Sequence, residues 1–386
     1  MTLIYNFDTT ATSPILPQVL DLYVRSLKED NLNPSSSHQG GINAARTVSR
    51  ARQKIARALD APEDAIIFTS GGTESTNHAL KGAAFASARL PKRLIITAGE
   101  HDATRQCAVF LKDKLGYDVD IVPLTTEGNV DIEAFCNSLK KAPTGLISFI
   151  AVSNETGAVN DLDELVRLSR QYAPDALIHA DIVQLAGKLP FSFRQSGFDF
   201  ASLSGHKFGA PKGTGALLAR PGANFVPLID GGGQQDGRRS GTENPPCAVA
   251  LAEAISIQSE AMEAHFKKVS SLRALFLDLL NEKKIPHRIL SPTDGSPYVL
   301  AVAFPGIRGE TLMHALSADR ILISTGSACG SRHQGKNEVL EAMGYLKDLI
   351  LSSCRISFSP FLTEDDVSYL VECIAANYKR YAIMPF

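Results

Sequence analysis

Short apolar runs alternate with amphipathic stretches between about residue 43 and residue 250. Short apolar runs bounded by polar residues, Gly or Pro are typical of buried strands. The stretch 43–59, NAARTVSRARQKIARAL, instead repeats its apolar positions every three or four residues, which predicts a helix. The predicted strands cover 65–69, 93–97, 118–122, 145–152, 176–180, 199–203 and 214–219.

The alternation of strands and helices predicts βαβ units, because consecutive parallel strands need a crossover connection that is usually a helix. We therefore expect an α/β fold with a mainly parallel seven-stranded sheet covered by helices on both faces. After Pro245 and Pro246 the pattern changes to a long helical stretch that runs to about residue 283. The remaining predictions are a strand at 298–304, a helix at 309–317, a Gly/Ser-rich loop at 324–335, a strand at 354–358 and a final helix from about residue 363.

The chain length predicts two domains, since 386 residues exceed the size that one hydrophobic core usually organises. We expect a large domain over residues 15–255 and a small α+β domain made of residues 1–14 and 256–386. A hydrophobic content of 44% and a charged content of 21% indicate a soluble globular protein. The net charge of −2 argues against a broad nucleic-acid surface, so no direct nucleic-acid partner is expected.

The sequence shows no pattern typical of export or membrane insertion. No apolar run reaches the roughly 20 residues that span a bilayer, and the N-terminal MTLIYNFDTT lacks a basic region followed by an apolar one. The cysteines form no CxxC pair, and a chain this long does not need disulfide bonds to fold. We therefore expect reduced thiols, a cytoplasmic protein without a membrane partner, and no resident metal. The six cysteines are Cys107, Cys136, Cys247, Cys329, Cys354 and Cys373.

A carboxylate and a lysine follow two of the predicted strands. Asp181 ends the apolar run 176–181, ALIHAD, and Lys207 lies in 204–215, SGHKFGAPKGTG. A lysine at the edge of an α/β sheet can form a Schiff base with pyridoxal phosphate (PLP), and an acid on a neighbouring strand can hold the pyridinium nitrogen protonated. Gln184 can then reach the ring hydroxyl. A structural salt bridge is the alternative for Asp181, whereas a surface role fits poorly for a lysine flanked by Gly, His and Phe.

Other segments at predicted strand ends supply candidates for the remaining parts of such a site. Residues 70–73, SGGT, join a strand to a helix, where backbone N–H groups bind phosphate; a tight turn with Thr73 as N-cap is the alternative. His101 can stack on a planar cofactor or move protons, or it is a structural loop histidine. Asn154 can donate to a ring oxygen or a substrate carboxylate, or it forms an Asx-turn.

Two more candidates come from the C-terminal part of the chain. Arg355 begins an alternating strand and offers a bidentate grip on a substrate carboxylate; an interdomain ion pair is the alternative. Cys329 lies in 324–331, STGSACGS, whose small residues predict a mobile and exposed loop. An exposed thiol suits nucleophilic chemistry, although buried cysteines are commoner. The other cysteines lie in apolar or helical contexts and are predicted to be inert.

Taken together, these segments resemble the cysteine desulfurases, within the class V group of fold-type I PLP enzymes. The likeness runs in order along nearly the whole chain, and nine collinear strings make it specific. The GSAC string with its extended loop is similar to the NifS/IscS-type branch. The strings are 7–14 FDTTATSP, 33–40 NPSSSHQG, 68–77 FTSGGTESTN, 99–104 GEHDAT, 153–159 SNETGAV, 179–188 HADIVQLAGK, 204–213 SGHKFGAPKG, 231–244 GGGQQDGRRSGTEN and 326–329 GSAC.

The resemblance implies a fold-type I PLP-transferase fold and gives roles to the matching residues. Lys207 would carry the Schiff base with PLP, and His101 would stack on the ring and act as acid–base catalyst. Asp181 would pair with the ring nitrogen and Gln184 with the ring hydroxyl. The phosphate would be held by Gly72, Thr73, Ser204 and His206.

The same resemblance implies how substrate and partners would bind. Arg355 and Asn154 would fix the carboxylate of L-cysteine, and Asn154 would also contact the cofactor. Cys329 would attack the substrate sulfur and become a persulfide, leaving L-alanine; it is also a candidate transient ligand of an iron–sulfur cluster. Thr242 would reach the phosphate of the partner subunit, which implies a homodimer. The sulfur would pass to an acceptor protein such as an iron–sulfur scaffold.

The chain departs from the family pattern at three places. Lys336-Asn337-Glu338 stands where the family usually has a Pro-Ser-like pair, which bears on the loop conformation and on the sulfur acceptor. Thr9-Thr10 replaces an Asn-Ala pair, and Ser13 replaces a Thr. For these two changes we expect local packing effects only.

We therefore expect a PLP-dependent cysteine desulfurase. Selenocysteine lyase, cystine lyase and a class V aminotransferase are the related alternatives, although a plain aminotransferase needs no thiol such as that of Cys329. A sulfur-relay scaffold without catalysis is opposed by the presence of Lys207 and Asp181. A nucleotide-binding protein is opposed by the lack of a phosphate-loop lysine and of an acidic ribose ligand. The sequence leaves the sulfur acceptor open.

Overall fold

A mixed seven-stranded sheet forms the centre of the computed structural model, which describes residues 4–86, 90–325 and 337–383. Its strand order is β2-β8-β7-β6-β5-β3-β4, and only β8 runs antiparallel to its neighbours. The predicted mainly parallel seven-stranded sheet is confirmed. The strands are β2 (Ile66–Thr69), β3 (Arg93–Thr97), β4 (Asp118–Val122), β5 (Leu146–Ile150), β6 (Leu177–Asp181), β7 (Phe200–Ser204) and β8 (Gly215–Ala219).

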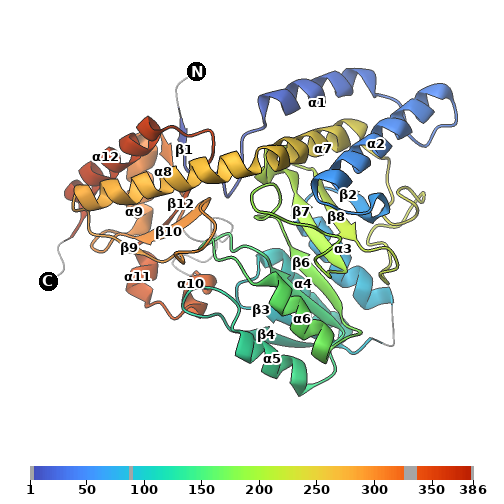
Figure 1. Cartoon of the computed structure of the whole chain (residues 1–386), viewed down its shortest axis with the longest axis horizontal. Coiled ribbons are helices and arrows are strands. Elements are labelled where there is room, and N and C mark those ends of the chain that lie inside the picture. Colours follow the sequence, from blue (N-terminus) through green and yellow to red (C-terminus); the bar gives the residue numbers. More distant parts are fainter. Residues whose placement is uncertain (1–3, 87–89, 326–336, 384–386) are drawn as a thin grey trace.

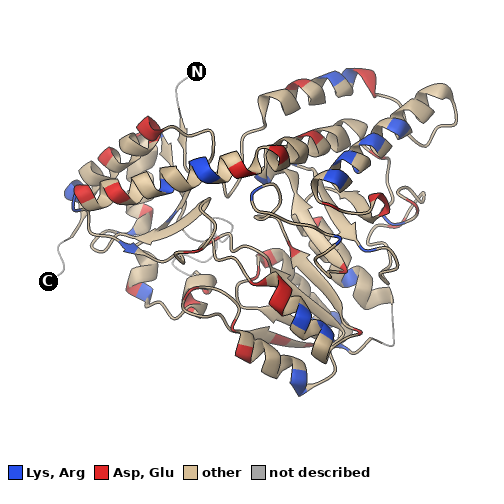
Figure 2. Ribbon diagram, viewed as in Figure 1, with Lys and Arg blue, Asp and Glu red and all other residues tan. Residues whose placement is uncertain are grey.

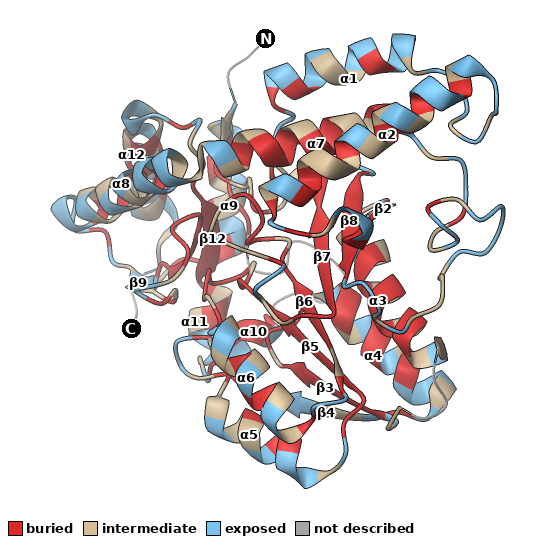
Figure 3. Cartoon of the chain, turned by 45° about the vertical axis from the view of Figure 1, so that its right-hand side comes forward, coloured by how far each residue is buried: buried red, intermediate tan, exposed pale blue. Residues whose placement is uncertain are grey.

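The burial of each strand explains its sequence pattern. Every residue of β3, β5, β7 and β8 is buried, so, apart from Arg93, these strands have apolar or small residues on both faces instead of an apolar–polar alternation. β4 lies at the edge of the sheet and carries Asp118 and Asp120. Figure 3 shows the buried strands in red, enclosed by helices whose outer faces are exposed.

Helices cover both faces of this sheet. Leu94 packs in the core beneath α3 and α4, whereas the next residue, Ile95, packs in the core beneath α5, α6 and α7. Successive side chains of a strand point to opposite faces, so one strand contributes to both cores. The helices of this lobe are α1 (Pro17–Glu29), α2 (Gln39–Ala58), α3 (Gly72–Ala86), α4 (Asp102–Leu115), α5 (Ile132–Lys141), α6 (Leu162–Tyr172) and α7 (Pro245–Glu260).

The smaller lobe combines short strands with helices. β10 lies between β9 and β12 in an antiparallel sheet, and β1 pairs in parallel with β11. Figure 1 shows this lobe beside the large sheet, with α7 and α8 leading from one lobe to the other. Its elements are β1 (Tyr5–Asn6), α8 (Met262–Glu282), β9 (Arg288–Ile289), β10 (Val299–Ala303), α9 (Gly309–Ala318), β11 (Ile321–Leu322), α10 (Glu338–Ala342), α11 (Lys347–Leu351), β12 (Ser353–Ser357) and α12 (Glu364–Tyr381).

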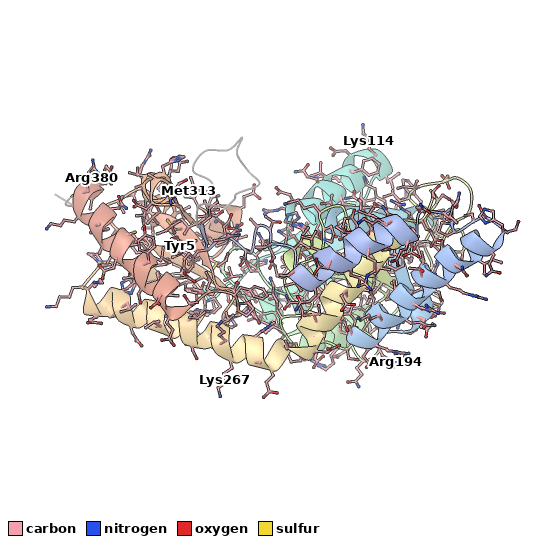
Figure 4. The ribbon with its side chains drawn as sticks, turned by 90° about the horizontal axis from the view of Figure 1, so that it is seen from above. Tyr5, Lys114, Arg194, Lys267, Met313 and Arg380 are labelled. Carbon is pink, nitrogen blue, oxygen red and sulfur yellow. The ribbon has the colours of Figure 1, made fainter. Side chains whose placement is uncertain are left out.

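The N-terminal segment passes from one lobe to the other. Phe7 packs with the C-terminal elements, whereas Leu16 packs in the core of the large sheet. Figure 4, seen from above, places Tyr5 and Arg380 in the smaller lobe and Arg194 in the larger one. These contacts favour the expected division of the chain into 15–255 and the remainder, which stays a prediction.

Some local predictions differ from the structure. The long helical stretch that was expected to reach residue 283 is two helices, because the chain bends at Ala261 between α7 and α8. Figure 2 shows positively and negatively charged residues interspersed along the outer helices. Among the described residues, no helix combines the length and the apolar character that crossing a membrane would require.

Candidate functional site

The carboxyl ends of four strands open into one cavity of about 360 Å³. Asp181 ends β6, and Ser204 ends β7. His101 follows β3, and Asn154 follows β5. Ligands of open α/β sheets bind at this edge. The predicted residues that line the cavity are Gly72, Thr73, His101, Asn154, Asp181, Gln184, Ser204, His206, Lys207 and Arg355.

Lys207 ends a short 3₁₀ turn, η2 (Gly205–Lys207), directly after β7. Its Nζ donates to the backbone oxygens of Thr10 at 2.9 Å and of Ala11 at 2.8 Å. Ser13 Oγ lies 3.1 Å from the Lys207 backbone oxygen. Two positions at which the chain departs from the family pattern, Thr10 and Ser13, therefore contact the lysine segment directly.

Asp181 supplies a buried carboxylate at the floor of the cavity. Only 5% of the residue is exposed, and its Oδ1 accepts from the backbone N–H of Val183 at 2.9 Å. Burial raises the pKa of Asp181, while the charges of His101 and Lys207 act in the opposite direction. A buried carboxylate stays ionised when a cation lies against it. This position therefore suits a protonated ring nitrogen.

The start of α3 forms a compact cradle. The helix begins at Gly72, so Thr73 lies in its first turn and the alternative of Thr73 as N-cap is wrong. Gly71 has a φ of +153°, and a Cβ added at Gly72 would lie 2.9 Å from Val183 Cγ2. The backbone N–H groups of a first helical turn have no partner within the helix, and they attract anions. The cradle therefore fits a phosphate group.

His206 stands beside this cradle as a neutral imidazole. Its Nδ1 lies 3.2 Å from Thr12 Oγ1. Burial, together with the positive charges of Lys207, Lys212 and Lys188, lowers the pKa of His206 to about 4. At neutral pH the ring can therefore donate one hydrogen bond to a phosphate but carries no charge.

His101 caps α4 while it lines the cavity. Its Nδ1 accepts from the backbone N–H of Ala103 at 3.1 Å. In the neutral ring this bond places the hydrogen on Nε2. His101 thus has the structural role given above as the alternative, and it also lines the cavity.

Arg355, on β12, is held by acidic groups from both lobes. Its Nη2 donates to Asp8 Oδ1 at 3.1 Å, and its Nη1 donates to the backbone oxygen of Asn154 at 3.1 Å and to Glu155 Oε1 at 3.4 Å. The ion pair with Glu155 joins the smaller lobe to the larger one. Within the described residues, the buried Nε of Arg355 has no hydrogen-bond partner. The side chain therefore keeps one donor for a bound anion.

Cys329 lies outside the described residues, but the chain on both sides of residues 326–336 is attached near Arg355. Ser324 and Arg355 exchange backbone hydrogen bonds of 3.1 and 2.6 Å. Asn337 donates through Nδ2 to Glu155 Oε2 at 3.2 Å and caps α10 through Oδ1. Both attachments are therefore to residues that line the cavity, Arg355 and Glu155.

The structure places Thr242 apart from the other predicted residues. Thr242 lines a separate hollow together with Ser70 and Arg239. Arg239 pairs with Glu74 in the first turn of α3. The single chain therefore does not bring Thr242 to its own cradle, and the role toward a partner subunit stays a prediction.

Glu100 is a residue of the cavity that the sequence did not reveal. It is fully buried, and its Oε1 accepts from Thr97 Oγ1 at 2.8 Å and from the Ile150 backbone N–H at 2.9 Å. Burial raises the pKa of Glu100 to about 8, with Asp181 adding to the shift. The only available signal was its place directly before His101 in GEHDAT.

Comparison with known proteins matches residues 4–370 to the family described as "Aminotransferase class-V". The chain belongs to this family. A protein of Dictyoglomus turgidum named "Cysteine desulfurase IscS" is 35% identical over 369 residues, which are 95% of this chain and 92% of the relative. Class-V enzymes of this kind are PLP-dependent, so PLP is the cofactor, and the expected fold-type I architecture is confirmed.

Two solved structures extend the comparison. One, titled "NIFS-LIKE PROTEIN", aligns with a TM-score of 0.92 at 34% identity and covers 98% of this chain and 100% of its own. The other, titled "SspA in complex with cysteine", aligns with a TM-score of 0.80 at 29% identity and covers 93% of this chain and 99% of its own. The class-V chain therefore shares its whole architecture with these proteins.

Proposed function

We propose that this chain is a cysteine desulfurase that converts L-cysteine into L-alanine and leaves the sulfur as a persulfide on Cys329. The observation that carries the proposal is the convergence of Lys207, Asp181 and Arg355 on one cavity. Relatives over nearly the full length are named cysteine desulfurase, and one structural relative is titled a complex with cysteine. A plain aminotransferase needs no thiol such as that of Cys329.

Four parts of the chain would hold the cofactor. PLP, when bound, withdraws electrons from the α-carbon of an amino acid. Lys207 would attach to its aldehyde, and Asp181 would pair with its ring nitrogen. His101 would lie against its ring. Its phosphate would be held by Gly72, Thr73, Ser204 and His206.

Arg355 and Asn154 would bind the substrate carboxylate. A guanidinium group recognises a carboxylate through paired N–H donors, and the unpartnered Nε of Arg355 supports this role. The bound carboxylate would orient the α-carbon toward Lys207. The Lys207 amine would then take the α-proton, and His101 would serve as a second proton-transfer group.

The thiolate of Cys329 would attack the sulfur of the bound cysteine. An S–S bond forms and the Cβ–S bond breaks, with its electron pair remaining on the carbon. Protonation of that carbon yields alanine, so one cysteine and one enzyme thiol give one alanine and one persulfide. The attachments of Ser324 and Asn337 beside Arg355 support this arrangement.

Replacement of Arg355 tests the carboxylate site. We expect Arg355→Leu to raise the KM for L-cysteine roughly 10- to 100-fold, because hydrogen bonds to a charged group contribute about 1.5–3 kcal/mol. kcat should fall less. Steady-state kinetics with alanine detection measures both, and the cofactor content of the variant must equal that of the wild type.

Two further variants show whether the change in KM comes from the loss of the Arg355 guanidinium group. Arg355→Lys retains the charge but loses the planar fork, so its KM should lie between those of the wild type and Arg355→Leu. Arg170→Leu is the matched control, because the partly buried Arg170 forms an ion pair with the buried Asp199 outside the cavity. An unchanged KM in a PLP-loaded Arg355→Leu enzyme would remove Arg355 from substrate binding.

The activity itself is tested by substrate comparison. The purified enzyme is incubated with L-cysteine, L-selenocysteine or L-cystine and a thiol reductant, and alanine and sulfide (or selenide) are quantified. Equal amounts of alanine and sulfide from L-cysteine support a desulfurase. Pyruvate in place of alanine would indicate a β-lyase, and exclusive turnover of selenocysteine would indicate a selenocysteine lyase.

The partners and the location are part of the same proposal. The persulfide would pass to an acceptor protein, such as an iron–sulfur scaffold, and two copies of the chain would form a homodimer through which Thr242 reaches the partner's phosphate. The five described cysteines are free thiols, which supports the predicted cytoplasmic location. Sedimentation of the holoenzyme measures whether it is a dimer.

A further inference from the structure

Four polar groups form a continuous hydrogen-bonded chain beside the cavity. Lys188 Nζ donates to Gln184 Oε1 at 2.8 Å, and Gln184 Nε2 donates to the backbone oxygen of Thr10 at 3.1 Å. Lys207 Nζ donates to the same Thr10 oxygen at 2.9 Å. The two lysines are therefore connected through one amide side chain and one carbonyl group.

Lys188 supports the site without lining it. The cavity is bordered by Gln184, Thr10 and Lys207, whereas Lys188 and Lys207 together line a smaller hollow behind it. The Lys188 ammonium group lies 5.7 Å from the centre of the Tyr298 ring, a contact that favours a cation. Burial lowers the pKa of Lys188 to about 7, and the charge of Lys207 contributes.

We propose that Lys188 is a positioning residue for the cofactor, acting through Gln184. An amide side chain has an oxygen end and a nitrogen end of similar shape, and an ammonium group only donates. Lys188 therefore fixes Gln184 with its oxygen turned away from Thr10 and its nitrogen turned toward it. The second hydrogen of Gln184 Nε2 then serves the ring hydroxyl oxygen of PLP, a role that rests on the proposed function.

Lys188 also places a positive charge near the attachment point of the cofactor. Like charges disfavour protonation of one another, so protonated Lys188, present below about pH 7, opposes an extra proton on the Lys207 nitrogen. The other titratable groups that interact with these two lysines are Asp181, His206 and Tyr298, and His101 acts in turn on Asp181. Removal of the Lys188 charge should therefore shift a proton equilibrium of the bound cofactor toward higher pH.

The test uses the holoenzyme of Lys188→Met, which keeps the length and packing of the side chain but loses donor and charge. We expect PLP to dissociate roughly tenfold faster, the loss that follows from one charged hydrogen bond to a buried amide. The pH midpoint of the visible cofactor band should move upward, by roughly half a unit to one unit. Lys188→Arg should keep both properties close to the wild type.

Two further variants show whether Lys188 acts through Gln184. Lys212→Met is the matched control, since Lys212 is an exposed lysine that also influences His206 but has no bond to Gln184; it should leave both readouts unchanged. In a Gln184→Leu background, Lys188→Met should add little to the rate of PLP release, because the amide that Lys188 orients is already gone.

The outcomes separate this inference from the proposed function. If the wild type shows no visible cofactor band, the proposed function itself fails. If the wild type binds PLP but Lys188→Met releases it no faster than Lys212→Met, the positioning role is wrong. Fully additive effects of Lys188→Met and Gln184→Leu would likewise overturn a role exerted through Gln184.

Discussion

Lys207→Ala is expected to abolish desulfuration, with a fall in turnover of about 10³-fold or more. The variant loses both the amine that attaches the cofactor and the group that takes the α-proton. In the wild type, Lys207 Nζ donates hydrogen bonds to the backbone oxygens of Thr10 and Ala11. The alanine side chain has no group that could replace these bonds. Alanine production from L-cysteine, measured by a coupled assay, gives the turnover.

A neighbouring lysine provides the control for this result. Lys212 lies on the same segment but is exposed, so Lys212→Ala should keep full activity and cofactor content. Thermal unfolding should show that Lys207→Ala remains folded. Turnover within tenfold of the wild type in Lys207→Ala would contradict the assigned role.

Cys329→Ala is expected to stop persulfide formation while cofactor and substrate still bind. Alanine and sulfide from L-cysteine should both fall at least about 100-fold, because no other thiol replaces the nucleophile. Cys107 and Cys354 are buried, and burial raises the pKa of each thiol to about 12, so neither supplies a thiolate near neutral pH. Mass spectrometry of the wild type should find the added sulfur on Cys329.

A second cysteine variant, Cys373→Ala, is the control for this result. Cys373 lies partly buried on α12, and Cys373→Ala should leave alanine production and persulfide labelling unchanged. The Cys329→Ala enzyme should keep the visible cofactor band and its spectral response to L-cysteine. Undiminished alanine and sulfide production in Cys329→Ala would remove this thiol from the mechanism.

The strands and their ends could be predicted because a strand that is buried on both faces is visible in the sequence as a short run of mostly apolar residues. The runs before Asp181 and after Arg93 are mostly apolar, since both faces of the sheet are covered. Asp181 interrupts such a run at its end, where a carboxylate is costly unless it has a partner. The polar residue therefore marks the site even before the fold is known.

The supporting residues could not be predicted, because their roles depend on contacts between distant segments. Hydrogen bonds connect Lys188 to Lys207 through Gln184 and the backbone of Thr10, which lies far away in the sequence. In the sequence, Glu155 has no feature that distinguishes it from other loop carboxylates. In the structure, it accepts hydrogen bonds from Arg355 and Asn337. Side-chain type and spacing along the chain do not show which distant residues come into contact in the folded protein.

The bend at Ala261, between α7 and α8, could not be predicted from the sequence either. Helical periodicity continues on both sides of this residue, so the sequence predicts one long helix, whereas the structure ends α7 at Glu260 and starts α8 at Met262. α7 packs on α1 and α2 in the larger lobe, and α8 packs on α12 in the smaller one. The direction of each helix is thus set by tertiary packing, which overrides local propensity.

Covalent labelling of Lys207 tests the central claim most directly. The holoenzyme is reduced with borohydride, digested, and its peptides are sequenced by mass spectrometry. We expect a pyridoxyl group on Lys207 and on no other lysine, so that Lys188 and Lys212 stay unlabelled. A label on another lysine, or an unlabelled Lys207 in a protein that retains PLP, would contradict it.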